Sequence, residues 1–210
     1  MEEKGIVVEN VYKSFGREKV LNNVSLTIRP GQIYGIVGNN GSGKTVLMKC
    51  ICGFMRPDKG KIYVDGKRIG RDVDFPESIG VIIETPGFIP HETGFSNLKI
   101  LAGLKGIIDY TEIKDTIRKV GLDPDMKKPV GKYSLGMRQR LGIAQAIMEN
   151  PNVLILDEPF NGLDKHGVEE MRQLLKELKK EGKAILLASH NARDIEELCD
   201  MVHDMEDVWE

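Results

Sequence analysis

The sequence has little that would suit a membrane-spanning, secreted or nucleic-acid-coating protein. It contains no run of about 18 apolar residues, which is the length that a transmembrane helix needs. Its start, MEEKGIVVEN, lacks the basic and apolar regions of a signal peptide. Lys and Arg total 30 against 32 Asp and Glu, so the basic excess of a large nucleic-acid interface is missing. These absences predict a cytoplasmic protein for which no nucleic-acid partner is expected.

Cysteine is also scarce, and its pattern fits a reducing compartment better than a disulfide framework. Cys50, Cys52 and Cys199 form an odd, scattered set, which fits a reducing compartment. The close pair Cys50 and Cys52 has two interpretations, either buried thiols on a helix or half of a metal site. No second pair follows downstream, so buried thiols are favoured. Residues 203–210 are rich in acidic side chains and are predicted to form a solvated tail.

What the sequence does contain is a series of short apolar strands. Those of the first third are rich in β-branched residues and bounded by Gly, Pro or Asn. They cover residues 5–11, 21–28, 32–37 and 61–65, and residues 79–84 form a further apolar strand. Residues 153–156 and 184–189 are continuous apolar runs, as strands buried on both faces of a parallel sheet require.

Helices are predicted between these strands. One should follow Gly43, and the 3.6-residue spacing of apolar side chains predicts another over residues 165–181. Residues 86–150 look mostly helical. The alternation predicts an α/β fold with a mainly parallel sheet, N-terminal antiparallel strands and an inserted helical lobe. We expect one domain over residues 1–210, with its core at about 1–85 and 151–210 and the lobe at about 86–150.

Residues 38–45 match the pattern G-x-x-x-x-G-K-[ST] between a predicted strand and a predicted helix. Glycines let the backbone curl so that its N–H groups point at phosphate oxygens, and the helix N-terminus adds positive charge. A ligand-free glycine-rich turn is the alternative, which the flanking strand and helix disfavour. Lys44 is expected to bind the β- and γ-phosphates, and Thr45 to offer its hydroxyl to Mg²⁺. The predicted ATP-binding residues are Gly38, Asn39, Asn40, Gly41, Ser42, Gly43, Lys44 and Thr45.

Two adjacent carboxylates end the apolar run of residues 153–156. A buried strand should not end in Asp157 and Glu158 unless positive charge is present there. Mg²⁺ with nucleotide phosphates would supply it, with Asp157 as a direct or water-mediated metal ligand. Glu158 would orient and deprotonate an attacking water. A solvated strand end is the alternative, and the phosphate loop upstream disfavours it. The chain is thus predicted to have a P-loop NTPase core.

Four further segments resemble the ABC ATPases. YSLGMRQRL at residues 133–141 resembles the signature L-S-G-G-Q followed by R-Q-R-L, and NGLD at 161–164 resembles the D-loop. His190 ends a predicted strand, as the switch histidine of that family does. Phe15 stands where an aromatic side chain commonly stacks on adenine. The order and spacing of these motifs resemble those of ABC ATPases from residue 5 to about residue 202.

The resemblance implies a homodimer of two copies placed head to tail, with two ATP molecules between them. Ser134 and the backbone around Gly136 of one copy would cap the γ-phosphate that the other copy holds. His190 would contact that phosphate and Asp164 would communicate across the dimer. A packed core aromatic is the alternative for Phe15, and a satisfied strand-end histidine is the alternative for His190.

The sequence departs from the family pattern in the Q-loop and in the signature. Glu84 stands where the Q-loop normally has glutamine, and Leu135 and Met137 replace a glycine and the glutamine of the signature. E-T-P-G-F and Y-S-L-G-M are similar to the transporter ATPases of bacitracin and lantibiotic self-protection. We expect Glu84 to lie near Mg²⁺ and to couple the core to the lobe.

The resemblance implies the ATP-hydrolysing motor subunit of an ABC transporter. A separate membrane permease would hold it on the inner face of the cell membrane, and a peptide antibiotic is one possible cargo. The alternative is a soluble ABC ATPase acting on ribosomes or DNA, but such proteins usually carry tandem cassettes, zinc modules or coiled coils. A GTPase is disfavoured because the base-reading motif N-K-x-D is absent from the sequence. A P-loop kinase is disfavoured because kinases lack the signature motif and the switch histidine.

Overall fold

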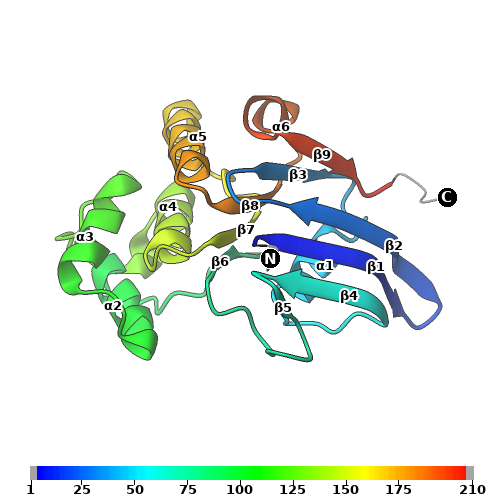
Figure 1. Ribbon diagram of the computed structural model, residues 1–210. Coiled ribbons are helices and arrows are strands. Elements are labelled where there is room, and N and C mark those ends of the chain that lie inside the picture. The colour runs from blue at the N-terminus through cyan, green and yellow to red at the C-terminus, as the bar shows by residue number, and fades with distance from the viewer. Residues whose placement is uncertain (1–3, 207–210) are drawn as a thin grey trace.

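The computed structural model describes residues 4–206, and these form two β-sheets with helices around them (Figure 1). The first sheet is antiparallel and four-stranded, in the order β2-β1-β4-β5. Its strands are β1 (Ile6–Phe15), β2 (Glu18–Ile28), β4 (Lys59–Val64) and β5 (Lys67–Arg68). This sheet is the group of N-terminal antiparallel strands that the sequence predicts.

The second sheet is parallel and five-stranded, in the order β6-β7-β8-β3-β9. Its strands are β3 (Ile33–Val37), β6 (Ile79–Ile82), β7 (Val153–Asp157), β8 (Ala184–Ala188) and β9 (Met201–Asp204). The α/β class and the mainly parallel sheet are therefore confirmed. Because the strands are parallel, the C-terminal ends of β3, β7 and β8 meet at one edge of the sheet, where ligands bind in open α/β folds.

Both faces of the parallel sheet are buried, as its continuous apolar strands require. Along β7, Val153 and Ile155 contribute to a core shared with the antiparallel sheet and with α1 (Lys44–Ile51). Leu154 and Leu156 point to the other face, into a core shared with the helices of residues 94–180. The alternation of strand side chains between two faces thus divides the protein into two apolar layers.

Two helices follow the strands of the C-terminal half. The first, α5 (Lys165–Lys180), buries Met171, Leu174, Leu175 and Leu178 against the sheet, as its predicted apolar face requires. The second, α6 (Ala192–Leu198), connects β8 to β9.

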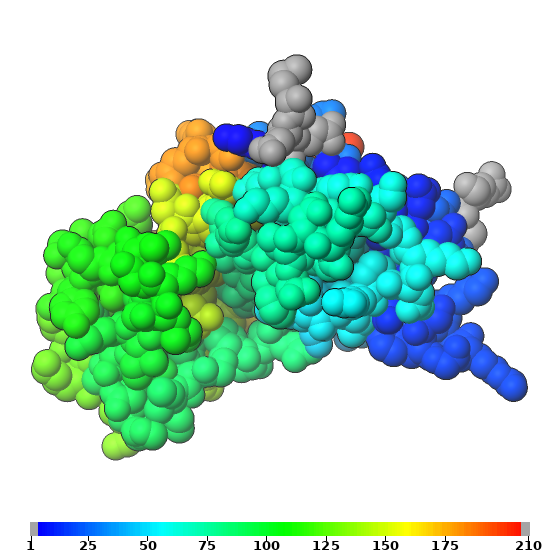
Figure 2. Space-filling model, turned by 60° about the horizontal axis from the view of Figure 1, so that its bottom comes forward, coloured from blue at the N-terminus to red at the C-terminus, as the bar shows by residue number. Residues whose placement is uncertain are grey.

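The segment between β6 and β7 is helical. It contains α2 (Gly94–Lys105), α3 (Tyr110–Lys119), the 3₁₀ turn Val130–Lys132 and α4 (Leu135–Ile147). Asp109 and Glu112 form a capping box at the start of α3, which satisfies backbone N–H groups that the helix leaves free. Figure 2 shows α2 and α3, in green, gathered at one end of the molecule beside the teal surface that precedes them.

The last described strand, β9, is absent from the sequence-based prediction. Residues 201–204 pair in parallel with β3, and His203 is only 8% exposed. The prediction that residues 203–210 form a solvated tail is therefore wrong for residues 203 and 204, while residues 207–210 lie outside the described part. The strand carries too few apolar side chains to be recognised, because it lies at the sheet edge and two of its residues are half exposed.

Candidate functional site

The phosphate loop connects the end of β3 to the start of α1. Gly38, Gly41 and Gly43 have φ angles of 138°, 91° and 99°, which only glycine adopts without strain. A Cβ atom on Gly43 would also lie 2.9 Å from the carbonyl oxygen of Val20. Steric constraints therefore explain why the motif has glycine at these positions. The loop curls at the amino end of a helix, as predicted.

Lys44 lies inside this curl and is only 9% exposed. Its Nζ donates to the carbonyl oxygens of Gly38 and Asn39 at 2.5 and 2.9 Å. The ammonium is thereby held over the loop, where it adds a full positive charge beside the amino end of α1.

Thr45 and Asp157 meet at the edge of the parallel sheet, although they are 112 positions apart in the sequence. The Thr45 hydroxyl donates to Oδ2 of Asp157 at 2.8 Å. Two oxygen ligands therefore lie together beside Lys44, and hydroxyl and carboxylate oxygens are the ligands that Mg²⁺ prefers. The residues present fit the predicted metal.

Glu158 follows Asp157 with a φ of 50°, which is uncommon for a residue other than glycine. Its N–H donates to the carbonyl oxygen of Ala188 at 3.0 Å, and its own carbonyl accepts from Nε2 of Gln139 at 3.3 Å. Its carboxylate Oε2 lies 2.8 Å from Nδ1 of His190. The unusual backbone turns the side chain away from the strand direction and towards the histidine.

A cavity of about 550 Å³ opens at this edge of the sheet. Its walls are the phosphate loop, residues 84–86, the first turns of α4 and the end of β7 with Glu158. Lys44, Thr45, Glu84, Asp157 and Glu158, which the sequence proposes as phosphate, metal and catalytic groups, all line it. The cavity therefore combines positive groups for an anion, oxygen ligands for a cation and a carboxylate base.

Glu84 lies at the wall of this cavity, two residues after the end of β6. Its φ is 62°, which ends the strand two residues earlier than the sequence predicts. Its Oε1 accepts a hydrogen bond from Nζ of Lys49 at 2.6 Å. Lys49 is a residue of the site that the sequence did not predict. The sequence feature that could have identified it is its position on α1 one turn after Thr45, which places both side chains on the same face of the helix.

Three of the predicted signature and D-loop residues line a different hollow, although Leu135 and Asn161 of the same two segments line the cavity of about 550 Å³. Ser134, Gly136 and Asp164 line a second cavity of about 340 Å³. Ser134 Oγ accepts from Met137 N–H at the start of α4, and Asp164 Oδ1 accepts from Gly167 N–H at the start of α5. Within one chain, these residues are thus not brought together with the phosphate loop.

Phe15 ends β1 away from both cavities. It is 48% exposed and belongs to neither core. Asp58 accepts from Lys13 Nζ at 2.9 Å and from Ser14 N–H at 2.7 Å, which fixes the strand end. The Lys13 hydrogen bond holds the pKa of the Asp58 carboxyl below its usual range. Lys13 Nζ lies 5.6 Å from the centroid of the Phe15 ring, which is otherwise half exposed on a fixed strand end, as a stacking surface would be.

The cysteines have no role at this site. Burial raises the pKa of the Cys50 thiol to about 11 and that of Cys52 to about 12, as is typical of buried structural thiols. Among residues 4–206, no group of three His, Cys, Asp or Glu side chains is placed to hold a metal.

Comparison with known protein families gives a match to the ABC transporter family over residues 21–161. The chain is 44% identical to the uncharacterized ABC transporter ATP-binding protein YybJ of Bacillus subtilis, over 95% of this chain and 92% of YybJ. It is 42% identical to the bacitracin transport ATP-binding protein BcrA of Enterococcus faecalis, over 94% of this chain but 65% of BcrA. It is 38% identical to the lantibiotic transport ATP-binding protein SrtF of Streptococcus pyogenes, over 93% and 84%.

A similar structure is the dimeric bacterial ABC transporter cassette MJ0796. The TM-score is 0.84 at 25% identity, and the match covers 95% of this chain and 94% of MJ0796. No helix in the described range 4–206 has the length and apolar character to cross a membrane.

Proposed function

Because this chain belongs to the ABC transporter family of ATP-binding proteins, we propose that it drives the transport of a peptide antibiotic, as an exporter or as a means of self-protection. The chain is an ABC-type ATPase and the ATP-binding subunit of a transporter. The proposed cargo rests on the names of BcrA and SrtF, to which the chain is 42% and 38% identical. The observation that carries the motor function is the cavity where Lys44, Thr45, Asp157 and Glu158 meet.

We assign the phosphates of ATP to the loop of residues 38–45. Lys44 would exchange its contacts with Gly38 and Asn39 for the β- and γ-phosphates, and the backbone N–H groups would bind the remaining oxygens. Phe15 would stack on the adenine.

Mg²⁺ would be held by Thr45 and Asp157, with Glu84 nearby at the cavity wall. When bound, the ion would neutralise negative charge that develops on the phosphates during phosphoryl transfer. Glu84 would reach this region only by leaving Lys49, and this fits a residue that senses the movement of the neighbouring segment.

Glu158 would orient and deprotonate the water that attacks the γ-phosphate. His190 would hold the Glu158 carboxylate through Nδ1 and contact the γ-phosphate through its other nitrogen. The bond from the attacked phosphorus to the β-γ bridging oxygen breaks, and ADP and phosphate leave.

A second copy of the chain would complete the site. Ser134, Gly136 and Asp164 line a hollow of their own, so another chain must supply these groups to each phosphate loop. Ser134 lies at the amino end of the 13-residue helix α4, whose free N–H groups suit an anion. MJ0796, which has the same fold, is a dimer.

A separate permease would provide the path through the membrane and hold this chain at the inner, cytoplasmic face. We assign the contact to the helical segment of residues 86–150, taken as a lobe inserted into the core of residues 1–85 and 151–210. The segment carries exposed apolar side chains, among them Ile100 at 48% and Leu104 at 80% exposure, which a partner would cover.

The first test is ATP binding by the variant Lys44→Ala, measured by titration calorimetry with Mg²⁺ and ATP. Binding should be abolished or nearly so, because the variant lacks the charge that meets the phosphates. Lys180→Ala is the control, since Lys180 is exposed at the far end of α5. Equal affinities for Lys44→Ala and wild type would rule out the phosphate-loop assignment.

The cargo has a separate test. The chain should be expressed in a sensitive strain together with the membrane protein encoded beside it, and the inhibitory concentrations of bacitracin and of a lantibiotic measured. Resistance that the Lys44→Ala variant cannot confer is the expected result. Unchanged sensitivity to both antibiotics would overturn the cargo and leave the motor function standing.

A further inference from the structure

His190 stands on a loop whose support lies behind it. The imidazole is 71% exposed, and Glu158 is the partner it contacts. The preceding residue, Ser189, is by contrast only 3% exposed. The position of the imidazole therefore depends on what holds Ser189.

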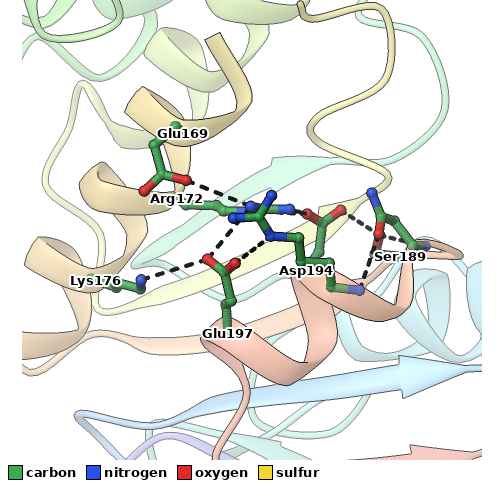
Figure 3. A network of polar contacts seen from close by, with 8 residues as sticks. Glu169, Arg172, Lys176, Ser189, Asp194 and Glu197 are labelled. Carbon is green, nitrogen blue, oxygen red and sulfur yellow. Dashed lines mark hydrogen bonds and ion pairs between the residues drawn. The ribbon is translucent and has the colours of Figure 1, made fainter. Parts of the chain in front are cut away.

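Ser189 is held by its hydroxyl. Ser189 Oγ donates to Oδ2 of Asp194 at 2.9 Å and accepts from Asn191 N–H at 3.2 Å (Figure 3). Asp194 lies in the first turn of α6 and is 2% exposed. The Ser189 hydroxyl thus joins the two ends of the short loop that contains His190 and is itself held by one buried carboxylate.

Asp194 is in turn fixed by Arg172 of α5. Its Oδ1 accepts from Nε of Arg172 at 2.9 Å and from Nη2 at 2.5 Å. Arg172 is 3% exposed and also contacts Glu169 and Glu197, at 3.6 and 3.4 Å. A guanidinium that donates twice to one buried carboxylate sets its orientation as well as its position, and breaking such a pair is costly.

The network connects α5 to the loop that contains His190. Arg172 stands on the helix that Asp164 caps, and Ser189 stands directly before His190. A chain of buried hydrogen bonds therefore leads from the D-loop helix to the histidine that contacts Glu158. The motifs on which the function rests include neither Arg172 nor Asp194.

We propose that Asp194, locked by Arg172, is a positioning residue for ATP hydrolysis that holds His190 against Glu158 through the Ser189 hydroxyl. This inference rests on the proposed roles of Glu158 and His190. It places the determinant of histidine geometry in the interior, out of reach of nucleotide and solvent.

The test removes only the last bond of the network. Ser189→Ala takes away the hydroxyl and leaves the Arg172–Asp194 pair intact, whereas a change at Asp194 leaves Arg172 buried with less compensation and risks unfolding. The purified full chain should be assayed for steady-state ATP hydrolysis and for equilibrium ATP binding. We expect kcat to fall by about 10- to 100-fold, because small displacements of catalytic groups cost this much, with KM changed by less than about 2-fold.

Ser189→Thr supplies the rescue, since it restores a hydroxyl and should return kcat towards wild type. Ser78→Ala is the matched control. Ser78 Oγ accepts from Asn152 N–H at 2.9 Å, before β6 and β7 begin and thus at the opposite edge of the sheet. It removes a side-chain hydrogen bond away from the site and should leave kcat unchanged.

Two results would overturn the positioning role. One is a wild-type kcat for Ser189→Ala. The other is a parallel loss of kcat and ATP affinity that Ser189→Thr fails to restore, which would indicate general structural damage. If wild type hydrolyses no ATP, the proposed function itself fails. If Glu158→Gln abolishes hydrolysis and Ser189→Ala does not reduce it, only the positioning role is contradicted.

Discussion

Nδ1 of His190 lies 2.8 Å from Oε2 of Glu158, so residues from the ends of two neighbouring parallel strands form one polar pair beside the phosphate loop. The pair joins a group that can accept the proton of water to a group that can orient the acceptor. Its members should behave as a unit in hydrolysis.

We expect Glu158→Gln to bind ATP and to lose hydrolysis by about 10²- to 10⁴-fold, the usual effect of removing a general base. His190→Gln should also lose hydrolysis, and the double variant should be little worse than Glu158→Gln, because groups that act together are not additive. Steady-state phosphate release measures all three. Glu181→Gln, an exposed change beyond α5, is the control.

The same variant tests assembly. Glu158→Gln with Mg²⁺ and ATP should accumulate as a dimer, since binding proceeds and turnover does not. Light scattering after size exclusion would detect it. Normal hydrolysis by Glu158→Gln would remove this residue from the role of base, and a monomer at saturating ATP would contradict the shared site.

The Lys49–Glu84 pair makes a second prediction. Lys49→Met should weaken Mg²⁺–ATP binding, because the freed Glu84 carboxylate repels the phosphates. The loss should correspond to about 1 kcal/mol or less, since the pair is partly exposed, and should shrink at high salt. Adding Glu84→Gln should restore affinity, and calorimetry at two salt concentrations checks both effects.

Lys67→Met is the matched control for that experiment. Lys67 forms a similar exposed pair with Glu77 at 2.7 Å, outside the cavity. Equal losses in Lys49→Met and Lys67→Met would indicate a non-specific charge effect. Glu84→Gln alone should keep ATP binding and change turnover in the complex with the permease. Unchanged ATPase and transport rates in that complex would exclude a coupling role.

Two glycines predict opposite changes in stability. A Cβ on Gly80 of β6 would lie 1.9 Å from the carbonyl oxygen of Ala146 in α4. Gly80→Ala should therefore lower the free energy of unfolding by about 1–3 kcal/mol, the usual cost of overpacking. Gly103 is exposed within α2 with open space around it, so Gly103→Ala should raise stability by about 0.5–1 kcal/mol. Urea denaturation measures both, and a stable Gly80→Ala protein would contradict the close contact of β6 with α4.

The sequence predicted those parts of the protein that local pattern determines. Continuous apolar runs identified β7 and β8, and the spacing of glycines around Lys44 identified the loop, since steric rules act within a few residues. Thr45 and Asp157 were each predicted as Mg²⁺ ligands from their motifs, and the parallel topology explains why they meet, because parallel strands end at the same edge.

The remaining contacts depend on tertiary register. Lys49 and Arg172 look like ordinary surface residues of amphipathic helices, and their partners Glu84 and Asp194 come from distant segments. β9 was missed because an edge strand with half-exposed residues has no apolar run. No periodicity marks such pairings, so only the folded arrangement reveals them.

The helix α4 extends from Ser134, its amino-terminal cap, to Gln139 and beyond, and Gln139 touches the carbonyl of Glu158 in the same chain. In a head-to-tail pair, the cap would face the nucleotide held by the neighbour, while Gln139 stays against the base that serves its own nucleotide. A helix moves as a rigid element, so a displacement of Ser134 at its N-terminus would also displace Gln139, about one turn further along. The two ATP sites of such a dimer would therefore be coupled, and hydrolysis at one site would affect the other.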